Sequence, residues 1–279
     1  MAPVNGFELR HELRSLEEFR ALRAQFPHII DRATIDALVR RGLAEGISSP
    51  FLGTVAPEAM ASATFNYRES FNAHGFSPRV RAVLDFLAFQ WPATVWPRLR
   101  LHVHEAVTPF ALLIRGKFPY ALASEYLPTP EEQAARFPIP HVDICRSGLP
   151  DATFDAILSN EVLEHVPSID DALQDMARIL KPDGYLIATF PFRYNNDESV
   201  RRARLLADGQ VEHLLAPEYL GNPVNPQGGS LVFEVPGWDI VPRARAAGFR
   251  DAFVVFDGST SRGVTGAEIA GILMFVAIR

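Results

Sequence analysis

The stretch from Phe154 to Phe192 constrains the fold more than any other part of this sequence. It begins with FDAILSN, an apolar run rich in Ile and Leu, as is typical of a central strand covered on both faces. Apolar residues then recur at helical spacing from Ile169 to Leu180. A second apolar run, YLIATFPF, completes the stretch. A strand, a helix and a strand within about 40 residues predict a right-handed βαβ unit of a parallel sheet.

The ends of the helix in this unit are also marked. Ser168 is placed to cap its amino terminus, with Asp170 and Asp171 in the first turn, where negative charge is favoured. Arg178 lies near the opposite end, and Lys181–Gly184 (KPDG) is expected to stop the helix before the second strand.

The same residues carry a family resemblance. The runs FDAILSNEVLEHV and ARILKPDGYLIATFP, at this spacing, resemble the fourth strand, following helix and fifth strand of class I S-adenosylmethionine (SAM) dependent methyltransferases, of the type 11 kind. The resemblance covers residues 66–279. It implies an α/β, Rossmann-like sheet of seven strands, the last one antiparallel, with an acceptor-binding insertion at about 193–237. Residues 1–65 fall outside the resemblance and are expected to form a helical cap or lid with a connector.

The chain also resembles one subgroup of these methyltransferases, which is found in sugar and natural-product gene clusters. In that subgroup a W-R-E-S-x-x-C-x-x-C-G segment precedes the core, and here the corresponding run is NYRESFNAHG. The cysteine positions hold Asn72 or Ala73 and His74, so we expect no metal site.

Composition narrows the classes of partner. The chain has 279 residues, 48% of them hydrophobic, and a net charge of −6. This charge argues against nucleic acid as the main partner, because phosphate binding needs a basic surface. The single cysteine excludes an intrachain disulfide framework. The charged start lacks an apolar signal core, and the apolar run IAGILMFVAI is too short to span a bilayer. We therefore expect a cytoplasmic protein without membrane partners, and a homodimer is one arrangement open to it.

The N-terminal part has a helical pattern from Leu9 to Gly46 and no strand pattern, and Pro27 divides it into shorter helices. A Pro-, Gly-, Ser- and Ala-rich connector follows at Ser48–Ala63. The helical part either covers a sheet edge or forms a lid over the acceptor pocket. Ser77-Pro78 then begins a helix that leads to the first strand of the core, predicted within Leu99–Val107.

The turn after that first strand departs from the family pattern. Class I methyltransferases usually place glycines there, so that backbone approaches the amino acid part of SAM. This chain has His104, Glu105 and Ala106, then Val107-Thr108-Pro109, without glycine. The resemblance places these three residues at the cofactor, with Glu105 near the methionine ammonium. A retained fold whose motif has lost its function is the alternative.

The next two strands supply the expected adenosine contacts. Glu125 ends the predicted second strand, where the resemblance implies a carboxylate that accepts hydrogen bonds from both ribose hydroxyls, and Tyr126 follows it. A solvated loop glutamate is the alternative. His141–Ile144 is predicted as a short third strand, and the resemblance places Asp143 at the adenine amino group and Ile144 beside the ring.

The fourth strand ends at Asn160 and Glu161, where ligands bind in open α/β sheets. His165 lies just beyond. It is expected to order this turn at the cofactor more than to act as a base.

The insertion carries the predicted acceptor site. We assign Phe192, Arg193, His213 and Tyr219 to substrate binding, and His213 as the catalytic base, because Leu220 replaces a histidine that is frequent in the subgroup. Arg193, Arg201, Arg202 and Arg204 form a basic cluster, either a pocket for an anionic or hydroxyl-rich acceptor or a solvated helix face.

These features predict methyl transfer from SAM, with S-adenosylhomocysteine (SAH) as product and no metal, to an oxygen or nitrogen of a small molecule in natural-product or sugar biosynthesis. Two alternatives stay open. One is non-methylating SAM chemistry, such as cyclisation of the aminocarboxypropyl group. The other is a cofactor-free relative that acts as a binding or scaffolding partner, or that uses the same pocket for other chemistry.

Overall fold

The computed structural model describes residues 7–279, which fall into two compact units. The first comprises the chain up to Val95 together with Val254–Met274, and the second comprises Trp96–Phe253 together with Phe275–Arg279. The sequence analysis divides the chain at residue 66 because the family resemblance begins there, whereas these two units are defined by compactness. The predicted domain boundary therefore stays a prediction. The first six residues of the predicted N-terminal element lie outside the described part of the chain.

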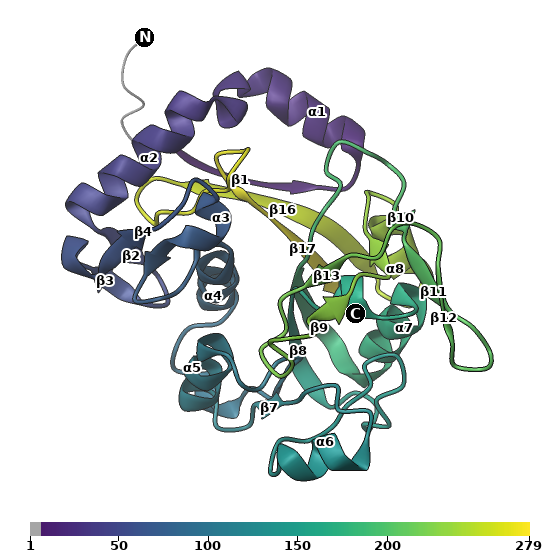
Figure 1. The fold of residues 1–279 in the computed structure, drawn as a ribbon. Helices are drawn as coiled ribbons and strands as arrows, with labels where there is room; N and C mark the ends of the chain where they lie inside the picture. The colour runs from purple at the N-terminus through teal and green to yellow at the C-terminus, as the bar shows by residue number, and fades with distance from the viewer. Residues whose placement is uncertain (1–6) are drawn as a thin grey trace. The chain divides into compact units, whose positions relative to one another are not determined.

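The central element is a seven-stranded mixed sheet with the strand order β1-β16-β17-β9-β8-β6-β7 (Figure 1). In that order the strands are Glu8–Leu13, Asp251–Ser259, Ile272–Ile278, Leu180–Thr189, Phe154–Asn160, Leu101–Val103 and Leu122–Ala123. Strands β9, β8, β6 and β7 pair in parallel, and β17 pairs antiparallel with β9. The predicted α/β class, with seven strands and the last one antiparallel, is confirmed.

Two expectations about the sheet's edges are wrong. The predicted third strand, His141–Ile144, is reduced to a single parallel bridge between Glu125 and His141. The seventh strand comes instead from β1, which pairs antiparallel with β16 in a stretch predicted to be helical. The sequence of β1 is ELRHEL, where Leu9 and Leu13 also fit a period of two. Tertiary pairing with the buried strand β16 therefore decides between two local patterns.

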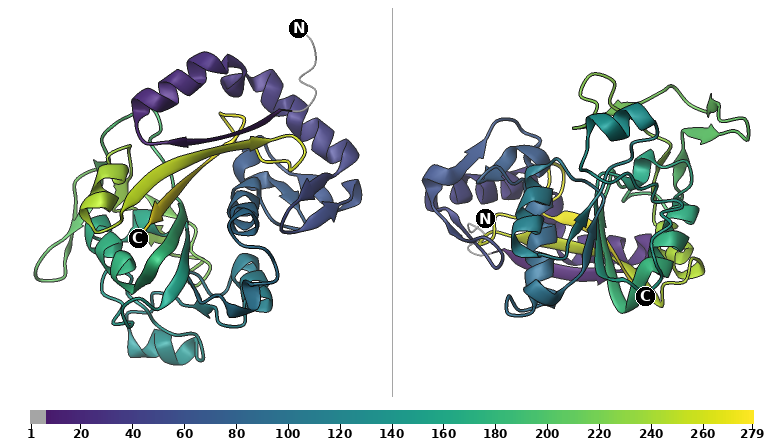
Figure 2. Two further views of the ribbon diagram at one scale, coloured as in Figure 1. Left: turned by 180° about the vertical axis from the view of Figure 1, so that it is seen from behind. Right: turned by 90° about the horizontal axis from the view of Figure 1, so that it is seen from below.

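In the first unit, the helical segment after β1 is confirmed and is divided at Pro27 as expected. The α1 helix spans Leu16–Gln25, a 3₁₀ turn spans Pro27–Ile30 and α2 spans Arg32–Glu45. Both Figure 1 and the view from behind in Figure 2 show α1 running along β1. Ser15 caps α1, and Gly46 ends α2 with a φ of 78°, a backbone conformation that glycine adopts without strain.

The predicted connector at Ser48–Ala63 contains short strands rather than irregular chain. These strands and the remaining elements of the first unit are β2 (Ile47–Ser49), β3 (Gly53–Val55), the 3₁₀ turn η2 (Pro57–Ala59), β4 (Met60–Ser62), α3 (Tyr67–Ser70), β5 (Phe71–Ala73) and α4 (Pro78–Gln90). Ser77 caps α4 and Pro78 is its first residue, as the sequence predicts.

In the second unit the predicted βαβ stretch is confirmed as β8, α7 (Ile169–Ile179) and β9. Ser168 caps α7 by accepting a hydrogen bond of 3.2 Å from the Asp171 amide. The expected turn at Lys181–Gly184 does not delay the strand, because β9 begins at Leu180. The ladder with β8 instead jumps from Phe154–Leu180 to Ala156–Tyr185, so these residues form a bulge inside β9.

The other helices of the second unit are short and lie between its strands. They are η3 (Trp96–Arg98), α5 (Pro109–Lys117), α6 (Pro130–Ala135), η4 (Leu163–His165) and α8 (Ile240–Ala246). Across residues 7–279, no helix is both long and apolar enough to cross a membrane.

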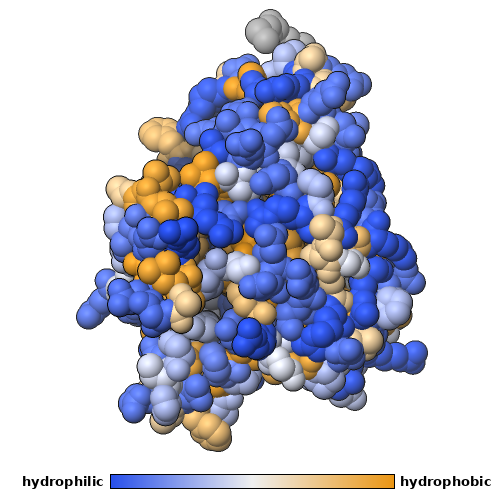
Figure 3. All heavy atoms as spheres, turned by 90° about the vertical axis from the view of Figure 1, so that its right-hand side faces the viewer, coloured by the Kyte–Doolittle hydropathy of each residue, from blue (hydrophilic) through white to orange (hydrophobic). Residues whose placement is uncertain are grey.

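The insertion forms three small antiparallel ladders rather than a helix. They are β10–β15 (Val200–Arg201 with Glu234–Val235), β11–β12 (Ala203–Leu205 with Val211–His213) and β13–β14 (Tyr219–Leu220 with Ser230–Leu231). Figure 2 shows the β11–β12 hairpin projecting from the rest of the second unit. The side seen in Figure 3, toward which this hairpin points in Figure 1, is mostly hydrophilic with hydrophobic residues gathered near its left edge.

Candidate active site

The parallel strands β7, β6, β8 and β9 bring their carboxyl ends to one edge of the sheet. Open α/β sheets bind ligands at this edge. Four of the predicted cofactor residues lie at or just after these strand ends: Glu105 after β6, Glu125 after β7, and Asn160 and Glu161 at the end of β8. The structure therefore gathers residues that lie up to 56 positions apart in the sequence.

Glu105 and Asn160 meet across this edge. Asn160 Nδ2 donates a hydrogen bond of 2.8 Å to Glu105 Oε1, and Asn160 Oδ1 accepts a bond of 3.3 Å from Thr189 Oγ1 at the end of β9. One amide side chain thus connects three strand ends. Glu161 follows with a φ of 53°, uncommon for a residue with a side chain, and its amide donates to the Thr189 carbonyl at 2.7 Å.

Glu125 binds the glycine-free turn after β6. Its Oε1 accepts a hydrogen bond of 2.7 Å from the amide of Ala106. Burial raises the pKa of this carboxyl group, and the amides of Ala106 and Val107 and the charge of Arg136 oppose that rise. The ribose contact that the resemblance implies would therefore be made by a carboxylate that already holds the turn.

Tyr126 and the predicted adenine residues, Asp143 and Ile144, follow segments that pair at Glu125 and His141. Tyr126 is 60% exposed, and its ring centroid lies 5.5 Å from that of His141. Burial, followed by the nearby Asp143, raises the pKa of the Tyr126 hydroxyl. Asp143 Oδ1 accepts a bond of 2.9 Å from the Cys145 amide, and Ile144 is buried. The structure thus brings Tyr126 and Asp143 together, although they do not lie on paired strands.

His104 is placed in the interior rather than facing solvent. Neither nitrogen of its ring has a hydrogen-bond partner, and the ring centroid lies 4.6 Å from that of His102. His102 Nε2 in turn lies 2.9 Å from Ser124 Oγ. Burial lowers the pKa of His102 to about 4 and holds that of His104 well below its ordinary value. Both imidazoles are therefore neutral near pH 7, and His104 adjoins the cofactor edge through its backbone.

His165 connects the end of β8 to the insertion. Its Nδ1 donates a hydrogen bond of 2.9 Å to the Leu231 carbonyl, and burial lowers the pKa of the ring. The Phe233 amide donates to the Glu164 carbonyl at 2.8 Å, and the Arg202 amide donates to the Phe233 carbonyl at 2.7 Å. This series of bonds fixes the insertion beside the strand ends. It supports the expectation that His165 orders the turn.

The predicted acceptor residues are spread over the insertion. The Phe192 ring packs at 5.1 Å on Trp238, and Arg193 donates to the Glu198 carbonyl at 2.6 Å. Tyr219 is 57% exposed on β13, and His213 is exposed on β12 opposite Ala203. Among residues 7–279, no hydrogen bond or ring contact described for His213 joins it to the predicted cofactor residues. Its role as a base stays a prediction.

Three of the four arginines in the predicted cluster pair with carboxylates of the insertion. Arg201 pairs with Glu234 at 3.0 Å, Arg202 pairs with Glu218 at 3.2 Å, and Arg204 pairs with Glu212. These residues lie on and between strands, so the solvated-helix interpretation does not hold. Because three of the four guanidiniums face a carboxylate, and Arg193 donates to a backbone carbonyl, the cluster offers less positive charge to an anionic acceptor than the sequence suggests.

A hollow of about 250 Å³ lies between α6 and the insertion. Tyr126 lines it together with Arg136, Asn222 and Asn225, three residues that the sequence analysis did not select. Arg136 donates a bond of 2.8 Å to the Val224 carbonyl across this hollow. The N-P and G-N dipeptides near Asn222 indicate a turn but do not reveal that the turn reaches α6.

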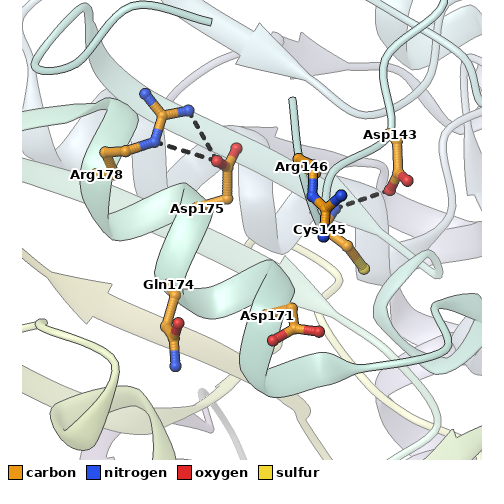
Figure 4. Close-up of a pocket in the computed structure, with 7 residues that line it drawn as sticks. All are labelled: Asp143, Cys145, Arg146, Asp171, Gln174, Asp175 and Arg178. Atoms are coloured by element: carbon orange, nitrogen blue, oxygen red, sulfur yellow. Dashed lines mark hydrogen bonds and ion pairs between the residues drawn. The ribbon is translucent and has the colours of Figure 1, made fainter. Parts of the chain in front are cut away.

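A second hollow of about 350 Å³ is shown in Figure 4. It lies between residues 143–146 and α7, and of the predicted cofactor residues only Asp143 lines it. Arg178 borders it and bonds to Asp175 at 2.7 Å and to the Leu149 carbonyl at 2.6 Å. Although larger, this hollow lies beside the helix, so we place the candidate site at the strand ends and the smaller hollow.

Comparison with known families supports this assignment. The family model described as a methyltransferase domain, Methyltransf_11, matches residues 120–188. The resemblance to the class I methyltransferases is confirmed. The matched segment contains Glu125, Tyr126, Asp143, Ile144, Asn160, Glu161 and His165. No curated protein matches the chain significantly.

Solved structures similar to this methyltransferase-like chain are remote. They include the SpnF cyclase, which is 13% identical; the match covers 96% of this chain and 97% of that chain, with a TM-score of 0.43. A SAM-dependent methyltransferase from Mesorhizobium loti is also 13% identical; its match covers 71% of this chain and 98% of that chain, with a TM-score of 0.42. A candidate sarcosine dimethylglycine methyltransferase from Galdieria sulphuraria is 19% identical, and its match covers 43% of this chain and 48% of that chain, with a TM-score of 0.34. The chain thus spans about half of that relative.

The residues at the strand ends fit SAM chemically. Glu105 and Glu125 provide carboxylates beside the parallel strand ends, which suit a sulfonium, an ammonium and ribose hydroxyls. Within residues 7–279, no group of three or more His, Cys, Asp and Glu side chains is arranged to hold a metal ion.

Proposed function

We propose that this protein is a SAM-dependent methyltransferase that methylates an oxygen or nitrogen of a small molecule in natural-product or sugar biosynthesis. One observation supports the proposal most directly. The methyltransferase-family match at residues 120–188 contains Glu125 and Asn160, and both residues bond to the turn after β6. SAM-binding residues expected from two parts of the chain therefore meet at one edge of the sheet.

In this proposal the chain acts mainly by binding and orientation. SAM itself supplies an electrophilic methyl group. Glu105, held by Asn160, stabilises positive charge near the methionine part, while Glu125 and Tyr126 hold the adenosine part. The insertion, fixed to the turn at Glu164 by the Phe233 amide, orients the acceptor for in-line attack.

For a hydroxyl acceptor, His213 is the proposed base. The side chain is exposed on a projecting hairpin, so it would act only on an acceptor that reaches this part of the insertion. A cytoplasmic location, a small-molecule partner and a homodimer belong to the same proposal.

The experiment is isothermal titration of the protein with SAM and with SAH. We expect micromolar binding of both, weakened at least about tenfold in Asn160→Ala, which removes the amide that holds Glu105. Asn72→Ala is the matched control, because the Asn72 side chain donates to the Ser70 carbonyl at 3.2 Å in the first unit. Absence of binding to either ligand would contradict the proposal.

The structure offers one observation for a second function, a cofactor-free relative. In the turn that usually contacts SAM, the amides of Ala106 and Val107 bond to the protein's own Glu125. A melting temperature that stays unchanged at high SAM would favour this alternative. Non-methylating SAM chemistry would instead release methylthioadenosine without any acceptor.

A further inference from the structure

The turn after β6 lacks the glycines that usually shape it, yet it is well supported. Ala106 is only 4% exposed, and its amide points to Glu125 Oε1 at 2.7 Å. The Val107 amide also bonds to this carboxylate. Two successive backbone donors thus converge on one side chain that lies 19 positions further along the chain.

The backbone of Glu125 is itself fixed on both sides. Its amide donates to the Pro140 carbonyl at 3.1 Å, and its carbonyl accepts from the Val142 amide at 3.0 Å. The preceding Ser124 amide donates to Val103, the last residue of β6, at 3.0 Å. The carboxylate is therefore presented to the turn from a rigid position rather than from a mobile loop.

We infer that Glu125 is a positioning residue that takes over the role of the missing glycines by holding the turn at residues 105–107 in place for the amino acid part of the cofactor. The inference rests on the proposed function for its last step only. A charge-assisted bond from a carboxylate to a backbone amide is among the stronger hydrogen bonds in proteins. Such a bond can hold a turn that has side chains at every position.

This role differs from a ribose contact and makes a different prediction. A residue that only binds ribose contributes equally to SAH and to methylthioadenosine, since both carry the ribose. A residue that also holds the turn contributes more to SAH, because only SAH has the amino acid part. The difference between the two ligands therefore isolates the positioning role.

The test uses the full chain and the variants Glu125→Ala and Glu125→Gln. In the absence of any ligand, hydrogen exchange at the amides of Ala106 and Val107 should become at least about tenfold faster in Glu125→Ala. In Glu125→Gln the exchange rate should lie between those of the original protein and Glu125→Ala, because a neutral amide oxygen still accepts a weaker hydrogen bond. In titrations, Glu125→Ala should lose at least about tenfold more affinity for SAH than for methylthioadenosine.

Asp155→Asn is the matched control. Asp155 Oδ2 accepts a bond of 2.8 Å from the Arg100 amide, next to the start of β6 rather than its end. This variant should leave exchange at Ala106 and Val107 unchanged. Unchanged exchange in Glu125→Ala, or equal losses for the two ligands, would overturn the inference. Faster exchange in a protein that binds neither ligand would uphold the anchoring of the turn and contradict the proposed function.

Discussion

Asn160 Nδ2 donates a hydrogen bond of 2.8 Å to Glu105 Oε1, and this bond joins the carboxyl ends of β8 and β6. The Asn160 side chain also accepts a hydrogen bond from Thr189 Oγ1 through its oxygen. Because it donates to one partner and accepts from the other, it can satisfy both only as an amide. Two predicted cofactor residues are therefore in direct hydrogen-bond contact.

The exchange Asn160→Asp should therefore be more damaging than Asn160→Ala. It replaces a donor by a carboxylate that faces Glu105, and two like charges at hydrogen-bond distance repel. We expect a loss of about 2 kcal/mol or more of unfolding free energy at pH 7, with partial recovery near pH 5 as one carboxyl group takes up a proton. Urea unfolding at both pH values measures this. Equal stability of the two variants at pH 7 would contradict it.

The buried pair His102 and His104 should make stability depend on pH. Burial lowers the pKa of both rings in the folded state, that of His102 to about 4, below an ordinary value of 6.5. The unfolded state then binds more protons between these values, so the stabilisation is complete above pH 6.5 and is lost as the pH falls toward 4. His102 alone accounts for about 3 kcal/mol over this window.

Urea unfolding between pH 4.5 and 7.5 tests this dependence. The variant His102→Gln, which keeps a polar group near Ser124, should show a flatter slope below pH 6.5. His213→Gln is the control, because His213 is exposed, and it should keep the slope of the original protein. A slope that His102→Gln leaves unchanged would assign the effect to other groups.

How far the sequence predicts this fold depends on whether the signal is local. The strand at Phe154–Asn160 and the helix that Ser168 caps are found where expected, because both patterns lie within one continuous stretch. The edge strands are not. The sequence predicts a helix where β1 forms and a strand at His141–Ile144, because pairing at a sheet edge depends on distant residues.

The same limit applies to the candidate site. Strand order places Glu105, Glu125 and Asn160 at one edge, and this much follows from the family pattern. The hydrogen bond between Glu125 and the Ala106 amide does not follow from the family pattern. The sequence does not indicate whether this carboxylate binds a ligand or the turn. Neither interpretation of the arginine cluster, a pocket or a solvated helix face, includes the pairing of Arg202 with Glu218 and of Arg204 with Glu212, because the pairing depends on strands that bring these residues together.

A buried ion cluster in the first unit should be sensitive to loss of its cation. Arg262 Nη1 lies 3.0 Å from Asp257 Oδ2 and 3.3 Å from Asp85 Oδ2, and the two aspartate side chains are at most 2% exposed. The variant Arg262→Met removes the guanidinium that bonds to both, while the charge of Arg10 still acts on them. Loss of one partner of a buried ion pair typically costs about 3–5 kcal/mol.

Chemical unfolding at pH 7 measures that loss, and the variant should become relatively more stable as the pH falls and Asp85, whose carboxyl pKa burial raises, takes up a proton. Arg41→Met is the matched control. Arg41 pairs with Glu45 at 2.8 Å on α2, both side chains are exposed, and loss of the pair should cost less than about 1 kcal/mol. Similar losses in the two variants would show that the buried cluster contributes no more than a surface pair.

The single thiol should be unreactive in the folded protein. Burial, followed by the charge of Asp143, raises the pKa of Cys145 to about 12, and the thiol donates a bond of 3.4 Å to the Ser168 carbonyl. Since the thiolate is the nucleophile, alkylation by iodoacetamide at pH 8 should be at least about 100-fold slower than in the unfolded chain. Asp143→Asn keeps an oxygen that can accept from the Cys145 amide but removes one charge. Alkylation should therefore accelerate in that variant and still remain slower than in guanidinium. A native rate equal to the unfolded rate would show that Cys145 is exposed by local opening rather than held against α7.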